Sequence, residues 1–313
     1  MVSMTMSLPT HIPVLAREAI EGLQAQPGGY VIDCTVGLGG HAAAILKRIS
    51  PQGKLLGIDT DPEAIRVAKA KLVDYKEAVI LANDSFANLD AICKKYDFYP
   101  VDGILFDLGV SSMQLDTAQR GFSFQREAPL DMRFNPRQEL TASDIVNTFS
   151  EQELAHIIKE YGEEHHSRRI AQHIVQSRPI TSTLQLAQVV EQVLGRHRTR
   201  IHPATRTFMA VRIAVNRELE SLKVALKQTI NLLSPRGRLV VISYHSLEDR
   251  IVKEFMRGEA SSYLRPPGMI ASHYGHTPTL KLISKKVIRP TLLEIESNPR
   301  SRSAKLRIAE RLG

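Results

Sequence analysis

Residues 31–41 read Val-Ile-Asp-Cys-Thr-Val-Gly-Leu-Gly-Gly-His, and this stretch decides the fold. The apolar run of residues 30–32 is typical of a buried strand, and residues 41–49 are rich in good helix formers. Glycines at a strand-to-helix turn let a ligand approach the main chain closely, and the first helical turn adds N–H donors. We therefore expect a strand, a glycine turn and a helix that together bind a ligand.

A second apolar strand, residues 54–59, ends in an acid and indicates the class of ligand. Asp59 follows the glycines by about 20 residues, the spacing at which nucleotide-binding folds place the carboxylate that accepts hydrogen bonds from ribose hydroxyls. Asp33 directly precedes the glycine turn and disfavours a pyrophosphate, because two negative charges would meet there. S-adenosylmethionine, which carries an ammonium and a sulfonium on an adenosine, fits the glycines and both acids.

Other interpretations of the glycine turn stay open at this point. The loop has no room for the G-x-x-x-x-G-K-[ST] motif of a nucleoside triphosphate site. It also lacks G-x-G-x-x-G, so a nicotinamide cofactor is the second choice. The plainest alternative is that Gly39 and Gly40 only form a tight turn.

The chain then repeats the alternation of strands and helices. Further strands are expected at residues 78–82 and 101–107, with helices between them. This alternation predicts a parallel, doubly wound sheet, in which ligands bind at the carboxyl ends of the strands. The polar groups expected at that edge are Asp33, Asp59, residues 84–86 and Asp107.

The alternation breaks after residue 114, so we predict a divided core. Residues 1–114 form its first part, residues 115–202 form a helical insertion, and residues 203–313 form its second part. The second part is expected to hold one long helix over residues 203–233 and a fifth strand over residues 238–243. Two shorter strands are expected near the C-terminus: residues 279–284 and 304–309.

Composition points to a polyanionic partner. The 313 residues carry a net charge of +8 with a pI of about 9.5. Residues 203–280 hold 11 Lys/Arg against 6 Asp/Glu, and residues 281–313 hold 9 against 3. Residues 196–202 contain no acid and form the densest basic stretch. A basic surface of this kind is typical of nucleic-acid binding, and we expect these residues to meet a phosphate backbone.

Several features predict a cytoplasmic protein. No apolar run is long enough to span a bilayer, and the first residues lack a signal-peptide pattern. The two cysteines form no C-x-x-C motif, which fits a reducing compartment. No metal site is expected, because adjacent residues such as His165 and His166 diverge by about 100° on a helix. A homodimer is compatible with the sequence.

Motifs spread along nearly the whole chain resemble those of the MraW (RsmH) methyltransferases. They lie at residues 11–15, 35–41, 57–59, 107–112, 119–124, 129–133 and 243–250. The resemblance implies an α/β fold, a class I (Rossmann-like) S-adenosylmethionine-dependent methyltransferase core with an inserted all-helical domain. It also implies methylation of N4 of a cytidine in the decoding centre of bacterial 16S ribosomal RNA, with the small ribosomal subunit as partner. The helical insertion at residues 115–202 would then serve in RNA recognition.

The resemblance also implies the residues that bind the cofactor. Gly39, Gly40 and His41 would lie against the methionine end, and Asp59 would hold the ribose. Phe86 would pack by the adenine. The pocket would be completed by Asp107 and Gln114. Met113 departs from the family, which often has proline there, and we expect it to alter loop stiffness more than chemistry.

Three residues are candidates for the chemistry itself. Asp107, or carbonyls just after it, would accept hydrogen bonds from N4, or it would bind only the cofactor. Tyr244 would stack on a flipped base or would serve only in packing, and His245 would face the same cleft or cap a helix. Three alternative functions remain: a methyltransferase acting on protein or a small molecule, a non-catalytic nucleic-acid-binding protein, and an NAD-dependent oxidoreductase.

Overall fold

The computed structural model describes residues 13–195, 202–262 and 277–313. They form two compact units, which are described separately. The α/β unit comprises the chain up to Gly109 together with Val224–Gly313, and the helical unit comprises Val110–Lys223. Residues 196–201 of the basic stretch lie outside the described residues.

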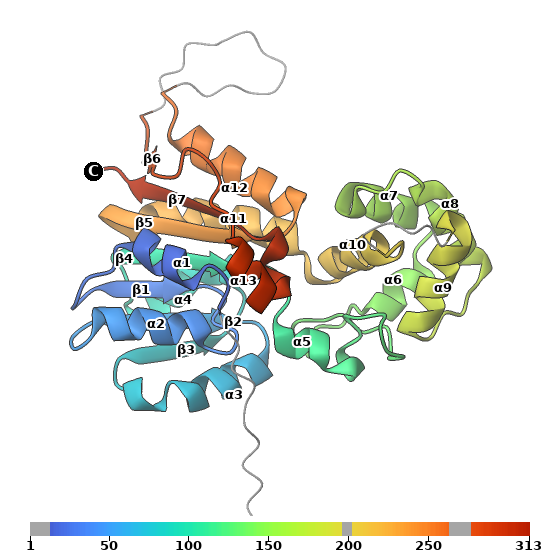
Figure 1. The fold of residues 1–313 in the computed structure, drawn as a ribbon, viewed down its shortest axis with the longest axis horizontal. Coiled ribbons are helices and arrows are strands. Elements are labelled where there is room, and N and C mark those ends of the chain that lie inside the picture. Colours follow the sequence, from blue (N-terminus) through green and yellow to red (C-terminus); the bar gives the residue numbers. More distant parts are fainter. Residues whose placement is uncertain (1–12, 196–201, 263–276) are drawn as a thin grey trace, which may run out of the picture. The chain divides into compact units, whose positions relative to one another are not determined.

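A seven-stranded sheet organises the α/β unit (Figure 1). Its strand order is β3-β2-β1-β4-β5-β7-β6, with β1 to β5 parallel and β7 antiparallel to both β5 and β6. The predicted parallel, doubly wound sheet is therefore confirmed. The strands are β1 (Tyr30–Asp33), β2 (Lys54–Asp59), β3 (Val79–Asn83), β4 (Val101–Asp107), β5 (Leu233–Ser243), β6 (Leu280–Leu282) and β7 (Lys305–Arg311).

The strands are covered on both faces. Consecutive residues of a strand point to opposite faces, yet Val31 and Ile32 of β1 both have no exposed surface. Strand order reverses between β1 and β4, since the chain moves outward from β1 in one direction through β2 and β3 and then returns to start β4 beside β1. A crevice forms at the carboxyl ends of the strands where the order reverses, which is where such folds bind ligands.

Helices of the α/β unit complete its core. Helix α1 contacts β4 and β5, and α2 contacts β1 and β2; Figure 1 shows both in front of the sheet. Asp61 caps α3 through its side chain, with Pro62 at the first helical position. The helices are α1 (Ala16–Leu23), α2 (Gly40–Ile49), α3 (Pro62–Lys71), α4 (Leu89–Tyr96), α12 (Ser246–Glu259) and α13 (Leu292–Ser297), with 3₁₀ turns η1 (Val73–Tyr75), η2 (Phe86–Asn88) and η4 (Pro299–Ser303).

The helical unit has its own apolar core. Helix α7 contacts α8 and α10, α8 contacts α9, and capping boxes begin α5, α6, α7 and α9. Its elements are α5 (Ser112–Asp116), η3 (Ala118–Arg120), α6 (Ala142–Thr148), α7 (Glu151–Gly162), α8 (Ser167–Gln176), α9 (Thr183–Leu194) and α10 (Thr205–Asn216). Across the described residues of both units, every helix is too short or too polar to cross a membrane.

Two predicted elements differ from the structure. The long helix expected over residues 203–233 is broken at Arg217, whose φ of 49° is left-handed, into α10 and α11 (Glu218–Leu232). Strand β5 begins at Leu233 rather than at residue 238, because Leu233 pairs with Val101 and the register then shifts. Residues 235–237 thus form an irregularity inside the strand.

The boundary between the two parts of the chain also differs from residue 202. Helix α10 belongs to the helical unit, because Phe208, Val211 and Val215 are buried in that unit's core. The return to the α/β unit begins at Val224, within α11. The apolar residues of α10 therefore pack within the helical unit, and not within the second part of the core as predicted.

Candidate active site

The glycine turn between β1 and α2 has two separate requirements for glycine. Gly39 caps α2 with a φ of 76°, a left-handed conformation that costs other residues about 1 kcal/mol or more. At Gly40 the need is space, because a Cβ atom there would lie 2.7 Å from Cγ of Pro13. The turn therefore keeps main chain, rather than side chains, at the start of α2.

Asp59 lies half-buried at the end of β2. Its Oδ2 accepts a hydrogen bond from the N–H of Gly37 at 2.9 Å, and its Oδ1 accepts one from the N–H of Asp61 at 2.9 Å. Burial raises the pKa of Asp59 to about 6, although these N–H groups act in the opposite direction. A carboxylate has about four lone-pair sites, so acceptor capacity for ribose hydroxyls remains.

Asp33 and His41 are buried side by side with polar atoms unsatisfied. Oδ1 of Asp33 accepts from the N–H of Thr35 at 3.1 Å, but Oδ2 has no hydrogen-bond partner among the described residues. Neither ring nitrogen of His41 has one there either. Burial raises the pKa of Asp33 to about 7, against the opposing effect of His41. Unsatisfied buried groups of this kind are typical of a ligand site, and an acid at this place suits a ligand with a cationic end.

Asp107 is the last residue of β4, the strand that lies between β1 and β5. Its N–H donates to Oγ1 of Thr35 at 2.7 Å, and its Oδ1 accepts from the hydroxyl of Tyr244 at 2.8 Å. Its Oδ2 lies 3.4 Å from Nε2 of His41. Burial lowers the pKa of His41, but Asp107 and then Asp33 outweigh burial, so the net shift is upward. The side chain of Asp107 remains 21% exposed, which leaves it accessible to a substrate.

Tyr244 and His245 are held at the junction of β5 and α12. His245 is the N-cap residue of α12, and Oε2 of Glu248 accepts from the N–H of Tyr244 at 2.9 Å. Nε2 of His245 lies 3.1 Å from Oε1 of Glu248. Tyr244 is half-buried and packs against the apolar core of the sheet. These contacts support the packing interpretation of Tyr244 and the capping interpretation of His245.

The remaining predicted cofactor residues lie in different places. Phe86, in η2 after β3, is half-buried and meets Phe106 edge-to-face with 5.7 Å between ring centroids. Gln114 is buried in α5 of the helical unit, where its Oε1 accepts from the N–H of Ser111 at 3.0 Å. The structure thus brings together Asp33, His41, Asp59, Asp107 and Tyr244.

Sequence reasoning missed two supporting contacts. Thr35 accepts a hydrogen bond from the N–H of Asp107, which lies 72 residues further along the chain. Tyr244 donates one to the carboxylate of Asp107, from which 137 residues separate it. Both positions lie inside motifs already noted, at residues 35–41 and 243–250. No local spacing could have paired them, because the contacts depend on which strands are neighbours in the sheet.

Comparisons with known proteins place the chain in a family. Residues 9–312 match the model of the MraW methylase family. The ribosomal RNA small subunit methyltransferase H of Dehalococcoides mccartyi is 55% identical over 302 residues, covering 96% of this chain and 86% of that protein. The proteins of the same name from Thermomicrobium roseum and Syntrophotalea carbinolica are 51% and 48% identical, covering 97% and 99% of this chain and 94% and 100% of theirs.

These matches cover the glycine turn, the three strand-end acids and the residues that follow β5. The resemblance drawn from the motifs is thereby confirmed. The chain belongs to the MraW methylase family and is a methyltransferase enzyme.

Proposed function

We propose that this enzyme transfers a methyl group from S-adenosylmethionine to N4 of a cytidine in the decoding centre of bacterial 16S ribosomal RNA. The observation that carries the proposal is the convergence of Asp33, Asp59 and Asp107 around the glycine turn, at the point where strand order reverses. The names of the relatives, which specify small-subunit ribosomal RNA, support the substrate class.

The residues of the glycine turn suit this cofactor. The carboxylate of Asp59 accepts hydrogen bonds from the ribose hydroxyls, and Asp33 and His41 face the methionine end. Oδ2 of Asp33, buried without a partner among the described residues, gives the ammonium an acceptor. Phe86 packs by the adenine. When bound, S-adenosylmethionine supplies a methyl group activated by a positively charged sulfur.

Asp107 acts on the acceptor nitrogen. The amino group of cytosine is a poor nucleophile because its lone pair is conjugated with the ring. A carboxylate that accepts hydrogen bonds from this amino group draws it towards tetrahedral geometry and stabilises the positive charge that develops on nitrogen. Tyr244 holds Oδ1 of Asp107 in place at 2.8 Å, so the carboxylate is oriented before substrate arrives.

Tyr244 keeps a second role open. Its half-buried ring would also be the stacking partner of a flipped base. His245 acts at the start of α12, where it pairs with Glu248, the residue that accepts from the N–H of Tyr244. A ribosomal substrate implies that the enzyme works in the bacterial cytoplasm.

Transfer of labelled methyl groups tests the proposal. The substrates are naked 16S RNA, 30S subunits and 70S ribosomes from cells that lack this gene, with the product mapped by mass spectrometry. We expect N4-methylcytidine at a single decoding-centre position. Tight binding of S-adenosylmethionine without transfer to any of the three substrates would contradict the assignment of the substrate while leaving the cofactor site intact.

A further inference from the structure

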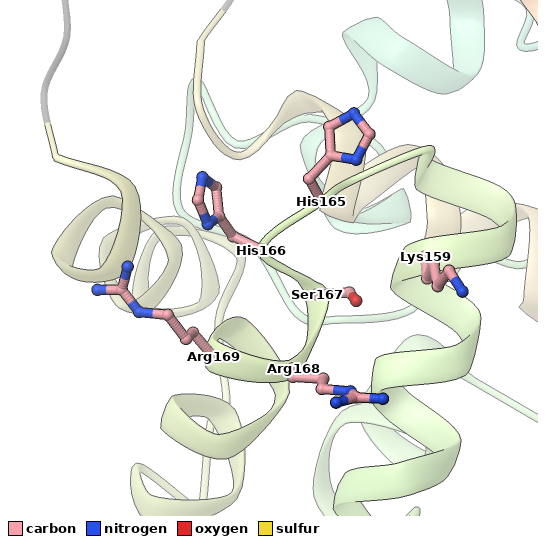
Figure 2. A pocket seen from close by; sticks show the side chains of 6 residues that line it. All are labelled: Lys159, His165, His166, Ser167, Arg168 and Arg169. Carbon is pink, nitrogen blue, oxygen red and sulfur yellow. The ribbon is translucent and has the colours of Figure 1, made fainter.

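A basic cavity lies at the junction of α7 and α8 in the helical unit. Its volume is about 330 Å³, and six residues line it. Five of them carry a basic side chain and the sixth carries a hydroxyl group. They are Lys159, His165, His166, Ser167, Arg168 and Arg169 (Figure 2).

The chain between the two helices gives this cavity its shape. Helix α7 ends at Gly162, where a Cβ atom would lie 2.8 Å from the carbonyl oxygen of Arg206, so α7 approaches α10 closely. Glu163 then takes a left-handed φ of 48° and turns the chain. The next residue, Glu164, is 6% exposed, and its Oε1 accepts from the N–H of His166 at 2.9 Å. The turn that presents the two histidines is therefore anchored from inside the unit.

The side chains around the cavity are exposed, apart from Ser167. Figure 2 shows Arg168 extending towards the helix that carries Lys159, with Arg169 and His166 on the other side of the α8 start. Nζ of Lys159 lies 4.0 Å from Oε1 of Glu160, and Nη2 of Arg169 lies 3.5 Å from the carbonyl oxygen of Val193. Both contacts are at the outer limit for an ion pair or hydrogen bond, so they neutralise little of the charge.

The start of α8 adds to this positive potential. Its N-cap residue, His166, makes no capping hydrogen bond through its side chain, and the first turn contains no acid. The positive end of the helix dipole therefore adds to the charges of Arg168 and Lys159. An anion with several acceptor oxygens matches this set of donors, and a cation does not.

We propose that this α7–α8 cavity binds a phosphodiester group of the RNA substrate, with Lys159 and Arg168 as its main contacts. The inference rests on the proposed function and deepens it by naming a contact point for the RNA backbone. Contacts to phosphate position a protein on nucleic acid without reading its sequence. The cavity thus adds affinity and orientation, while base recognition belongs elsewhere.

The test measures the affinity of 16S RNA for the full-length enzyme at a series of salt concentrations. The variant K159A/R168A removes both main phosphate-binding side chains, and K69A/K71A is the matched control. The control also removes two exposed lysines, which lie in the last turn of α3. Helix α3 starts at the carboxyl end of β2, so its last turn lies near the amino ends of the strands. Both double variants lower the net charge by two.

We expect K159A/R168A to weaken RNA binding about 10-fold. The plot of log affinity against log salt should become shallower by about 0.7 for each phosphate group that the variant no longer neutralises. KM for RNA should rise with kcat and cofactor affinity unchanged. The control should retain the wild-type salt slope.

Two results would overturn the inference, and they differ in what else they overturn. Equal salt slopes and KM values for wild type and K159A/R168A, with wild-type methyl transfer intact, would reject the cavity alone. A wild-type enzyme that neither binds nor methylates 16S RNA, free or assembled in subunits, would reject the cavity and the proposed function together.

Discussion

The hydroxyl of Tyr244 donates a hydrogen bond to Oδ1 of Asp107 at 2.8 Å, although 137 residues separate the two. Their strands, β4 and β5, are parallel neighbours, so their carboxyl ends meet at one edge of the sheet. Burial, and next the charge of Asp107, hold the pKa of Tyr244 well above its ordinary value. The hydroxyl therefore stays protonated, and its hydrogen bond to Asp107 persists throughout the physiological pH range.

The variant Tyr244→Phe tests whether this bond orients the Asp107 carboxylate for the proposed methyl transfer. A hydrogen bond to a charged group contributes about 1.5 kcal/mol, so we expect kcat for methyl transfer to fall about 10-fold. KM for S-adenosylmethionine should change little, and base stacking on the ring should persist. Tyr75→Phe is the matched control, because Tyr75 packs against the same apolar core. An unchanged kcat in Tyr244→Phe would show that the Tyr244 hydroxyl does not orient Asp107 for methyl transfer.

The variant Asp107→Asn separates the two roles considered for this residue. If Asp107 acts on the cytidine amino group, loss of its charge should reduce methyl transfer at least about 100-fold while S-adenosylmethionine still binds within about 3-fold of wild type. Equilibrium binding and single-turnover transfer measure the two quantities separately. A parallel loss of both would mean that Asp107 serves only to bind the cofactor.

The buried carboxyl group of Asp33 predicts how the stability of the cofactor-free enzyme depends on pH. Its pKa is about 7 in the folded state and near the ordinary value of 3.8 in the unfolded state. The folded state therefore binds this proton more tightly than the unfolded state does. The contribution of this difference to the free energy of unfolding falls as the pH rises above the unfolded pKa, and it is lost as the pH passes through 7. A shift of this size corresponds to about 4 kcal/mol. Asp59, with a pKa of about 6, acts in the same direction.

The variant Asp33→Asn isolates this contribution. The asparagine oxygen still accepts from the N–H of Thr35, but it carries no charge to bury. Without cofactor, the variant should melt above wild type at pH 8 and should lose less stability between pH 6 and pH 8. It should also bind S-adenosylmethionine more weakly. Asp102→Asn, on the exposed part of β4, should follow the wild-type curve; identical curves for Asp33→Asn and wild type would contradict the argument.

The edge of the sheet that forms the site could be predicted from sequence because its information is local. Each of Asp33, Asp59 and Asp107 directly ends an apolar run, so its place at a strand end follows from its neighbours. The contact between Tyr244 and Asp107 could not be predicted, because it depends on the order of the strands in the sheet and on the lengths of both side chains. The break between α10 and α11 at Arg217 could not be predicted either. Apolar residues continue at helical spacing across it, and the sequence has neither glycine nor proline there.

Gly39→Ala should show that the glycine turn serves the cofactor as well as the fold. At a φ of 76° an alanine is strained, and we expect a loss of about 1 kcal/mol in the free energy of unfolding. Gly28→Ala is the matched control, because Gly28 has a φ of 84° and open space around it. Both variants should lose similar stability in thermal unfolding. Only Gly39→Ala should weaken S-adenosylmethionine binding, and equal affinities would argue that the turn is purely structural.

The junction of α10 and α11 offers a stabilising substitution. Arg217 is exposed and adopts a left-handed φ of 49°, which glycine adopts without strain. Arg212 and Glu218 already tie the two helices together at 2.8 Å, so the junction does not depend on the Arg217 side chain. We therefore expect Arg217→Gly to raise the free energy of unfolding by about 1 kcal/mol in urea titrations. Lys223→Gly, within α11, should lower it by about the same amount. A loss of stability in both variants would mean that residues 205–232 favour one continuous helix.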